Sequence, residues 1–474
     1  MTNFWDSNVW SGLLIIAILF AFMLIAHILR RKIPFLSKSL LPPSVLGGVI
    51  ILIFTTIFKL VTKENFFELE IFQMGNISGI GTLEVITYHA LAVGFICMGL
   101  KSSGNKKHNK KRTTEIFNTG VTTVTTYLIQ AVVGLTVTML AAVILKDLEG
   151  FNPAAGIILC LGYGQGTGQA LNFGTQYQVD YGFKHGAGFG LAVAAMGFLV
   201  ASIGGVIVLN ILKRKGKINV NGNEDSENLD LSHYQTHNEI PVNGSIDKLT
   251  IQIALIIMVY AVVYGIMYVL GLLVPGMKGT IFGFNFLLGT LVAVLFKAII
   301  NKCRQKKLIN HVYINDFMMN RIGGVAFDIM IVAGIAAIDI TNLKSYLGIL
   351  LIMGALGAVV TFIYVMFVSK KLFKDYPYEQ FFAMYGMLTG TASTGMILLR
   401  EIDPEFKTPV SDNLVYQNLP AIIFGLPIMF LVPYAAKGWT ETITVFIIVI
   451  VLLIILLLIL FRSYIFKKKT KNVD

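Results

Sequence analysis

Two glycine-rich segments contain the residues best suited to chemistry in this sequence. Residues 162–170 read GYGQGTGQA and residues 386–395 read GMLTGTASTG, so both contain a Gly, three further residues and then Gly-Thr. This density of Gly disfavours continuous helical hydrogen bonding and leaves backbone groups without helical partners. Free N–H groups at the start of a helix favour an anion such as a carboxylate, whereas free carbonyls and hydroxyls can replace the water shell of Na⁺. The two segments therefore predict a site for an anionic substrate and a cation.

The candidate site residues are the polar residues and glycines of these two segments. For the substrate they are Gly164, Gln165, Gly166, Thr167, Gly168, Gln169, Thr389, Gly390, Thr391, Ser393 and Thr394, and the hydroxyls of Thr167 and Thr391 are also candidate Na⁺ ligands. The alternative is that the glycines only allow helices to pack closely, as small-xxx-small patterns do in many membrane proteins. We favour a binding site because the pattern occurs twice with hydroxyl and amide side chains.

Two charged residues in or beside apolar stretches are further candidates. Asp328 is a candidate cation ligand, here Na⁺, or a proton carrier, because a carboxylate inside a membrane is costly; the alternative is an ion pair with Arg321, seven residues earlier. Arg400 follows the second glycine-rich segment, and its guanidinium could bind a substrate carboxylate in a bidentate manner. The alternative for Arg400 is an interfacial charge beside Glu401.

The elements that must position these residues are membrane-spanning helices. Of the 474 residues, 55% are hydrophobic and 14% are charged, against about 25% charged in an average soluble domain. This composition excludes a soluble enzyme, and it argues against a nucleic-acid partner despite the net charge of +12. Stretches long enough to cross about 30 Å of hydrocarbon are residues 11–29, 40–61, 85–100, 120–145, 188–212, 249–274, 281–300, 322–340, 346–369, 414–435 and 442–461.

Positive charges indicate how these eleven spans are oriented. If the glycine-rich stretches 154–174 and 381–399 are re-entrant hairpins that do not cross, 31 of the 38 Lys and Arg residues lie on the cytoplasmic side and 7 lie outside. Making either stretch a full crossing would destroy this bias. We therefore expect a multi-pass protein of the inner (plasma) membrane with its N-terminus outside and its C-terminus in the cytoplasm.

The order of the spans predicts an inverted repeat. A polar linker separates two halves of five spans, and each half has its glycine-rich stretch between its fourth and fifth span. Because five is odd, the second half starts on the opposite side of the membrane. The predicted fold is an all-α integral membrane protein with the following parts: a first repeat at 1–212, the linker at 213–247, a second repeat at 248–435, and an extra span with a basic tail at 436–474.

The chain resembles the bacterial sodium/glutamate symporters over most of residues 10–435. Besides the two glycine-rich segments, the similarity includes Leu41-Pro42-Pro43-Ser44-Val45-Leu46-Gly47-Gly48 and Met98-Gly99-Leu100. The resemblance implies that two hairpins enter from opposite faces and that their tips meet at the substrate and Na⁺ sites. It also implies a homodimer in which a transport domain moves against a scaffold.

These observations together predict a secondary transporter that couples Na⁺ to the uptake of a small organic anion, with glutamate favoured. An H⁺-coupled or uncoupled carrier of another amino or carboxylic acid is the alternative, ahead of a channel or a membrane-embedded enzyme. We expect no cofactor apart from Na⁺ as the coupling ion. Cys97, Cys160 and Cys303 are too far apart to form a CxxC metal site.

Overall fold

The protein is helical throughout the residues that the structure describes. A computed structural model describes residues 3–101, 110–145, 150–218, 247–308, 313–403 and 407–465. Within these ranges the chain forms helices and, apart from an isolated bridge between Met74 and Ile77, no β-structure. Most of the predicted linker (219–246) and the basic tail after residue 465 lie outside the described residues.

Ten helices in the described ranges are long and apolar enough to cross a membrane. They are α1 (Ser7–Lys32), α3 (Pro43–Thr62), α4 (Gly79–Leu100), α5 (Lys110–Ile144), α8 (Gly186–Leu199) joined through the π-helical segment η4 (Val200–Gly204) to α9 (Gly205–Arg214), α10 (Lys248–Leu273), α12 (Asn285–Gln305), α13 (Asp316–Ala336), η8 (Lys344–Tyr346) with α14 (Leu347–Leu372), and α19 (Trp439–Leu460). The prediction of an all-helical membrane protein is confirmed, and the eleven predicted spans compare with ten such helices, or eleven if a bent pair is counted as one span. Helix α5 starts ten residues before the predicted span because the apolar pattern marks only the part of a helix that lies in hydrocarbon.

The predicted span at 414–435 corresponds to two helices with a bend between them. Helix α17 (Val410–Tyr416) precedes α18 (Asn418–Ala435), and the pair is bent by 48° at a short break. Pro420 follows this break, and a proline ring clashes with the preceding helical turn and removes one hydrogen bond.

Two shorter pairs of helices correspond to the glycine-rich segments. The first pair is α6 (Ile158–Gln165), preceded by the 3₁₀ turn η3 (Pro153–Ile157), and α7 (Thr167–Tyr181). The second pair is α15 (Pro377–Thr389) and α16 (Ala392–Arg400). The remaining short elements are α2 (Pro34–Lys38), η1 (Phe66–Glu68), η2 (Glu70–Phe72), η7 (Pro275–Met277), α11 (Lys278–Gly283) and α20 (Arg462–Ile465).

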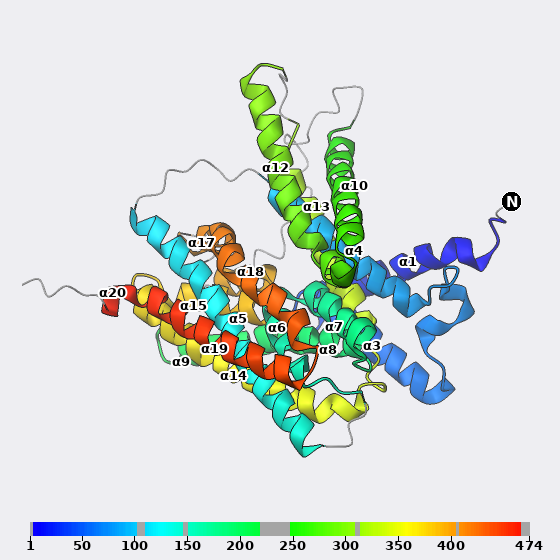
Figure 1. The fold of residues 1–474 in the computed structure, drawn as a ribbon, viewed down its shortest axis with the longest axis horizontal. Helices are drawn as coiled ribbons and strands as arrows, with labels where there is room; N and C mark the ends of the chain where they lie inside the picture. Colours follow the sequence, from blue (N-terminus) through cyan, green and yellow to red (C-terminus); the bar gives the residue numbers. More distant parts are fainter. Residues whose placement is uncertain are drawn as a thin grey trace, which may run out of the picture.

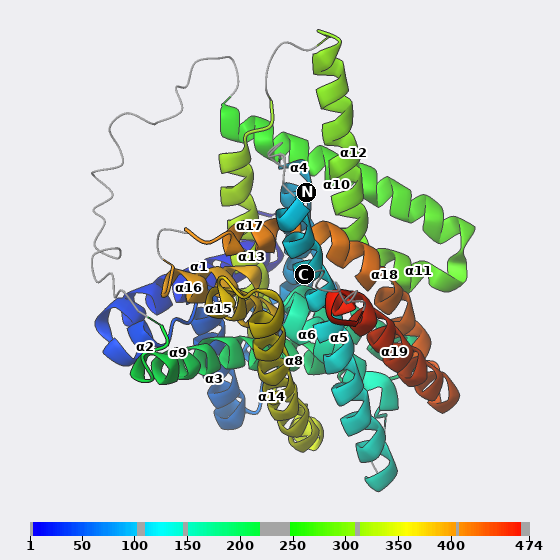
Figure 2. The same cartoon turned by 90° about the vertical axis from the view of Figure 1, so that its left-hand side faces the viewer.

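The helices pack into two groups (Figures 1 and 2). The six-helix group contains α1, α3 and α4 from the first half of the chain and α10, α12 and α13 from the second, with α10 and α12 projecting away from the other helices (Figure 1). The hairpin group contains α5 to α9 and α14 to α19. Each half thus supplies three helices to one group, and then a long helix, a broken pair and a further helix to the other.

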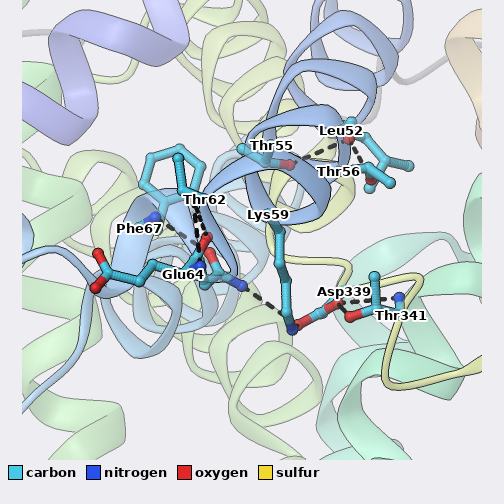
Figure 3. Close-up of polar contacts among 10 residues, drawn as sticks. Leu52, Thr55, Thr56, Lys59, Thr62, Glu64, Phe67, Asp339 and Thr341 are labelled. Atoms are coloured by element: carbon cyan, nitrogen blue, oxygen red, sulfur yellow. Dashed lines mark hydrogen bonds and ion pairs between the residues drawn. The ribbon is translucent and has the colours of Figure 1, made fainter.

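Two lysines of the six-helix group bond to the chain just beyond the ends of α13 and α4, where it continues to the hairpin group. Lys59 near the end of α3 donates to the carboxylate of Asp339 at 2.5 Å, just beyond the end of α13 (Figure 3). Lys297 on α12 donates to the carbonyl of Lys101 at 2.7 Å, just beyond the end of α4. Helices α3 and α12 are the second long helices of their halves, so the two contacts hold matching places in the two halves.

Helix α19 has one buried and one exposed apolar face. It packs along α5 and α18, and the Thr442 hydroxyl donates to the Ala435 carbonyl at 3.0 Å. The exposed face consists of large aliphatic residues, namely Ile443, Ile447, Val451, Ile454 and Leu458. An apolar face without protein contacts is suited to lipid.

Candidate substrate and sodium site

The first broken pair packs along helix α5. The Thr138 hydroxyl donates to the Pro153 carbonyl at 2.7 Å, where η3 begins. Nearer the middle of α5, the Tyr127 hydroxyl donates to the Gly164 carbonyl at 3.0 Å, where α6 ends. Helix α6 therefore runs antiparallel to α5 and ends beside its midpoint.

The chain then reverses and returns to the end from which α6 started. Gly166, with φ of +82°, separates α6 from α7. Beyond α7 the Lys184 amide donates to the Gly150 carbonyl at 2.9 Å, and the rings of Phe151 and Phe183 lie 5.7 Å apart. We call α6 and α7 hairpin 1, since both of its ends lie together near the Ile144 end of α5.

The second broken pair follows α5 from its opposite end. The Gln380 amide donates to the Thr119 hydroxyl at 3.2 Å at the start of α15, and the Gln130 amide donates to the Leu388 carbonyl at 2.9 Å near its end. Helix α15 therefore runs parallel to α5 as far as its midpoint.

Both flanks of this second pair contact the first turn of α5. The Lys111 ammonium lies 2.7 Å from the Asp375 carboxylate, which precedes α15, and Arg112 donates to the Pro409 carbonyl at 3.2 Å, which follows α16. We call α15 and α16 hairpin 2. Its ends lie at the Lys110 end of α5, so the two hairpins approach the middle of this helix from opposite ends.

The tips of the two hairpins meet beside the middle of α5. A Cβ built on Gly166 would lie 4.0 Å from the Thr391 methyl and 3.7 Å from the Phe198 ring. Helix α7 starts at Thr167 and α16 starts at Ala392, so both helices begin where the tips meet. Unsatisfied N–H groups and the positive end of the dipole are concentrated at the start of a helix.

In hairpin 1 the predicted site residues are packed at the tip. The Thr167 hydroxyl is fully buried and donates to the Met330 carbonyl of α13 at 3.2 Å. Gly168 faces Leu91 of α4, and a Cβ on Gly164 would collide with the Tyr127 ring. Gln165, the last residue of α6, is half-buried.

Gln169 is the most unusual polar residue at this tip. Its side chain is fully buried, and within the described part of the chain neither its amide nitrogen nor its oxygen has a hydrogen-bond partner. A buried amide without partners costs about 1–3 kcal/mol. A ligand with both donor and acceptor capacity would satisfy this side chain.

In hairpin 2 the hydroxyls have mixed surroundings. The Thr389 hydroxyl is buried and donates to the Tyr385 carbonyl at 2.7 Å. Thr391 is the N-cap of α16, because its hydroxyl accepts from the Thr394 amide at 3.2 Å, so part of its bonding capacity serves the helix. Thr394 is buried, whereas Ser393 is exposed.

Two residues of α5 that were not predicted as site residues are bonded to the hairpins beside the tips. Tyr127 and Gln130 lie three residues apart and each donates to a carbonyl next to one tip, that of Gly164 or Leu388. A carbonyl at the end of α6 and one near the end of α15 thus accept hydrogen bonds from α5. The N–H groups at the starts of α7 and α16 are the backbone groups that remain for a ligand. A buried Gln in a predicted span is the one signal in the sequence that could have pointed to this role.

Asp328 lies close to the first tip but not in it. Its carboxylate accepts from the Ser44 hydroxyl at 2.7 Å, while Arg321 lies over the Phe317 ring at 5.2 Å. The structure therefore shows Asp328 bonded to Ser44 at the start of α3, whereas the guanidinium of Arg321 stacks on Phe317. Met330, two residues further along α13, is the residue that accepts from Thr167.

Arg400 is separated from the tips. It is the last residue of α16, nine residues after Thr391, which at 1.5 Å per residue corresponds to about 13 Å along the helix. Arg400 is therefore not among the residues that the structure brings together.

The second arms of the two hairpins, α7 and α16, are covered to different extents. Helix α7 is covered by α11, because Asn172 donates to the Gly283 carbonyl at 3.1 Å and Gln176 donates to the Thr280 hydroxyl at 2.8 Å. Helix α16 packs mainly on α15 and leaves Ser393 exposed.

The candidate cation ligands at the two tips are hydroxyl and backbone carbonyl oxygens. Among the residues that the structure describes, no group of three or more His, Cys, Asp or Glu side chains could hold a metal ion. Hydroxyl and carbonyl oxygens suit hard cations, whereas a transition metal would prefer imidazole or thiolate.

Comparison with known protein families identifies the chain. A comparison with curated proteins finds no match. The model of the family described as sodium/glutamate symporter matches residues 9–407, which is well over half of the sequence and includes both hairpins. The chain therefore belongs to the sodium/glutamate symporter family.

Proposed function

We propose that this protein is a Na⁺-coupled glutamate symporter that holds its substrate between the tips of hairpins 1 and 2. Membership of the family implies the coupling and the substrate. The observation that carries the location is that α7 and α16 both begin where the tips meet. Two helix amino ends directed at one place form a natural anion site.

The chemistry of glutamate matches these groups. Its two carboxylates need N–H donors and positive dipole ends, and the starts of α7 and α16 supply both. The unpartnered Gln169 amide can donate to a carboxylate and accept from the ammonium group. Gly166 allows close approach of the backbone, since no side chain projects from this position.

The membrane arrangement follows from the same geometry. We propose that the protein lies in the inner (plasma) membrane and that both hairpins are re-entrant. Hairpin 1 enters from outside and hairpin 2 enters from the cytoplasm. The paired ends of each hairpin at opposite ends of α5 support this arrangement. The bias of 31 to 7 basic residues supports a cytoplasmic C-terminus.

The two helix groups suit alternating access. We propose that the six-helix group is the scaffold and forms the homodimer contact, and that the hairpin group moves. The projecting helices α10 and α12 support this, because their exposed apolar residues have no partner helix within the described chain (Figure 2). The coverage of α7 and the exposure of Ser393 support a state closed to the outside and open to the cytoplasm.

Uptake of radiolabelled glutamate into proteoliposomes tests this function. We expect accumulation under an inward Na⁺ gradient and none when K⁺ replaces Na⁺. A proton gradient that drives uptake without Na⁺ would favour the H⁺-coupled alternative, for which the Asp328 carboxylate is the candidate carrier. Competition by aspartate, glutamine and 2-oxoglutarate then defines the substrate class. Lack of glutamate uptake under every gradient would contradict the proposal.

A further inference from the structure

The helix that follows hairpin 1 changes its winding beside the two tips. Between α8 and α9, residues Val200–Gly204 form a π-helical segment, in which hydrogen bonds join residues five apart. Such segments are rare, and they occur frequently at functional sites. No proline lies within this segment to account for the change.

This π-segment packs against the tip of hairpin 2. A Cβ on Gly390 would lie 3.0 Å from the Ala201 Cβ, and a Cβ on Gly197 would collide with the Thr389 carbonyl oxygen. The Phe198 ring, one turn before Ser202, lies 3.7 Å from the Cβ position of Gly166. The segment therefore borders the tip of hairpin 2, and the turn of α8 directly before it borders both tips.

Ser202 lies in the middle of the segment with an unused hydroxyl. The residue is fully buried, and across the described ranges of the chain its Oγ has no hydrogen-bond partner. A helical serine usually donates to the carbonyl four residues earlier. A hydroxyl left unpaired in a protein interior is costly, so a missing partner is expected here.

The nearby carbonyls indicate what this partner is. At the tips, the Gly164 carbonyl accepts from Tyr127 and the Leu388 carbonyl accepts from Gln130, so these two oxygens are already used. The Thr389 carbonyl oxygen, at the last residue of α15, lies over Gly197, in the last turn of α8 before the π-segment. Neutral hydroxyl and carbonyl oxygens in a buried position are the ligands that a hard monovalent cation needs.

We infer that the Ser202 hydroxyl, together with the Thr389 carbonyl, binds a coupling Na⁺ between the π-segment and the tip of hairpin 2. This inference rests on the proposed function and assigns a ligand outside both glycine-rich segments. It also links the cation to the geometry of hairpin 2, because Thr389 directly precedes Gly390. A bound Na⁺ would hold α15 against the π-segment and so stabilise the tip at which the substrate binds.

The test compares Ser202→Ala and Ser202→Thr with a matched control, Ser369→Ala. Ser369 is equally buried in α14 but lies near the Lys371 end of that helix, away from the tips. Glutamate uptake is measured against Na⁺ concentration, and loss of one ligand should raise the half-saturating Na⁺ concentration of Ser202→Ala about ten-fold. We expect glutamate KM at saturating Na⁺ to change little, and Ser202→Thr, which keeps the hydroxyl, to retain more Na⁺ affinity than Ser202→Ala.

A second measurement does not depend on transport. The thermal unfolding temperature of the purified protein is recorded with NaCl and with choline chloride, without glutamate. Na⁺ should stabilise the wild type and Ser369→Ala, and Ser202→Ala should need a higher Na⁺ concentration for the same shift.

The outcomes separate the inference from the proposed function. Wild-type uptake that does not depend on Na⁺ would contradict the proposed coupling itself. Na⁺-dependent uptake with an unchanged half-saturating concentration in Ser202→Ala would overturn the Ser202 site alone and would assign a water molecule to this hydroxyl. Equal weakening in Ser369→Ala would also overturn it.

Discussion

Hairpins 1 and 2 have the same sequence pattern at their tips but use their glycines differently. Gly166 has φ of +82° and ψ of −169°, a region accessible essentially to Gly, while a Cβ there would have no contact closer than 3.7 Å. Gly390 has a negative φ of −137°, and a Cβ there would lie 3.0 Å from the Ala201 Cβ. The same Gly-Thr pattern is therefore needed for backbone conformation in hairpin 1 and for space in hairpin 2.

The hairpins differ also in how the protein covers them. The α7 arm carries Asn172 and Gln176, which are bonded to α11, whereas the α16 arm leaves Ser393 exposed. This difference indicates that, in the described conformation, access to the tips is more restricted on the side of hairpin 1.

The largest effect is expected for Gly166→Ala. An alanine would have to occupy a backbone region that costs roughly 1–3 kcal/mol, so the tip should rearrange and glutamate uptake should fall more than about ten-fold. Gly348→Ala is the control, since a Cβ on Gly348 in α14 meets nothing within 4 Å. Normal uptake by Gly166→Ala would show that the broken tip is not used for binding.

Gly390→Ala should have a smaller effect that can be partly reversed. The added methyl would lie 3.0 Å from both the Ala201 Cβ and the Gly386 carbonyl oxygen, so uptake should fall several-fold. The double variant Gly390→Ala/Ala201→Gly should recover part of the uptake, because it removes one of these two contacts. The same Ala201→Gly change should not rescue Gly166→Ala. Rescue of both variants would remove the distinction between the two tips.

Gln169→Leu should separate stability from binding. Removing a buried amide without partners should leave the apo protein at least as stable, and loss of its contacts should raise the glutamate KM by about ten-fold. Thermal unfolding and uptake kinetics of the same preparation give both quantities. An unchanged KM would place the substrate away from α7.

The smallest effect is expected for the ion pair between Lys59 of α3 and Asp339, just beyond the end of α13. Burial raises the pKa of Asp339, but hydrogen bonds from Lys59 and Thr341 outweigh this, and the pKa lies below its usual value (Figure 3). The stability from this pair is therefore present above the ordinary pKa of an Asp and is lost as pH falls through the lowered value. Asp339→Asn should lower the unfolding temperature slightly at pH 7.

The loss in Asp339→Asn should become smaller toward pH 3, where the wild-type carboxylate is itself protonated. Asp375→Asn is the matched control, because its partner Lys111 is exposed and such surface pairs contribute little. A loss that grows as the pH falls would contradict the assigned shift.

Much of the fold could be predicted from the sequence, because apolar length and basic residues are local signals. The order of the spans followed from these signals, the two broken segments followed from their glycines, and the family followed from short sequence motifs. The different conformations of Gly166 and Gly390 could not be predicted, since φ depends on how each tip meets its neighbours.

The candidate site was predicted less completely than the fold. Thr391 reads as a cation ligand in the sequence but caps α16, and Arg400 follows the tip in sequence yet lies at the far end of its helix. Gln130 and Ser202 were not selected, because their roles arise from contacts between residues far apart in the chain.

Accessibility of the second tip tests the central claim most directly. In a Cys303→Ser background, Ser393→Cys is exposed to a membrane-impermeant maleimide in inside-out and right-side-out vesicles. The account predicts labelling from the cytoplasmic face, slowed when glutamate and Na⁺ are present together, because the substrate site lies at the start of α16. Labelling only from outside, or labelling that glutamate and Na⁺ leave unchanged, would contradict a substrate site formed by two hairpins that enter from opposite faces.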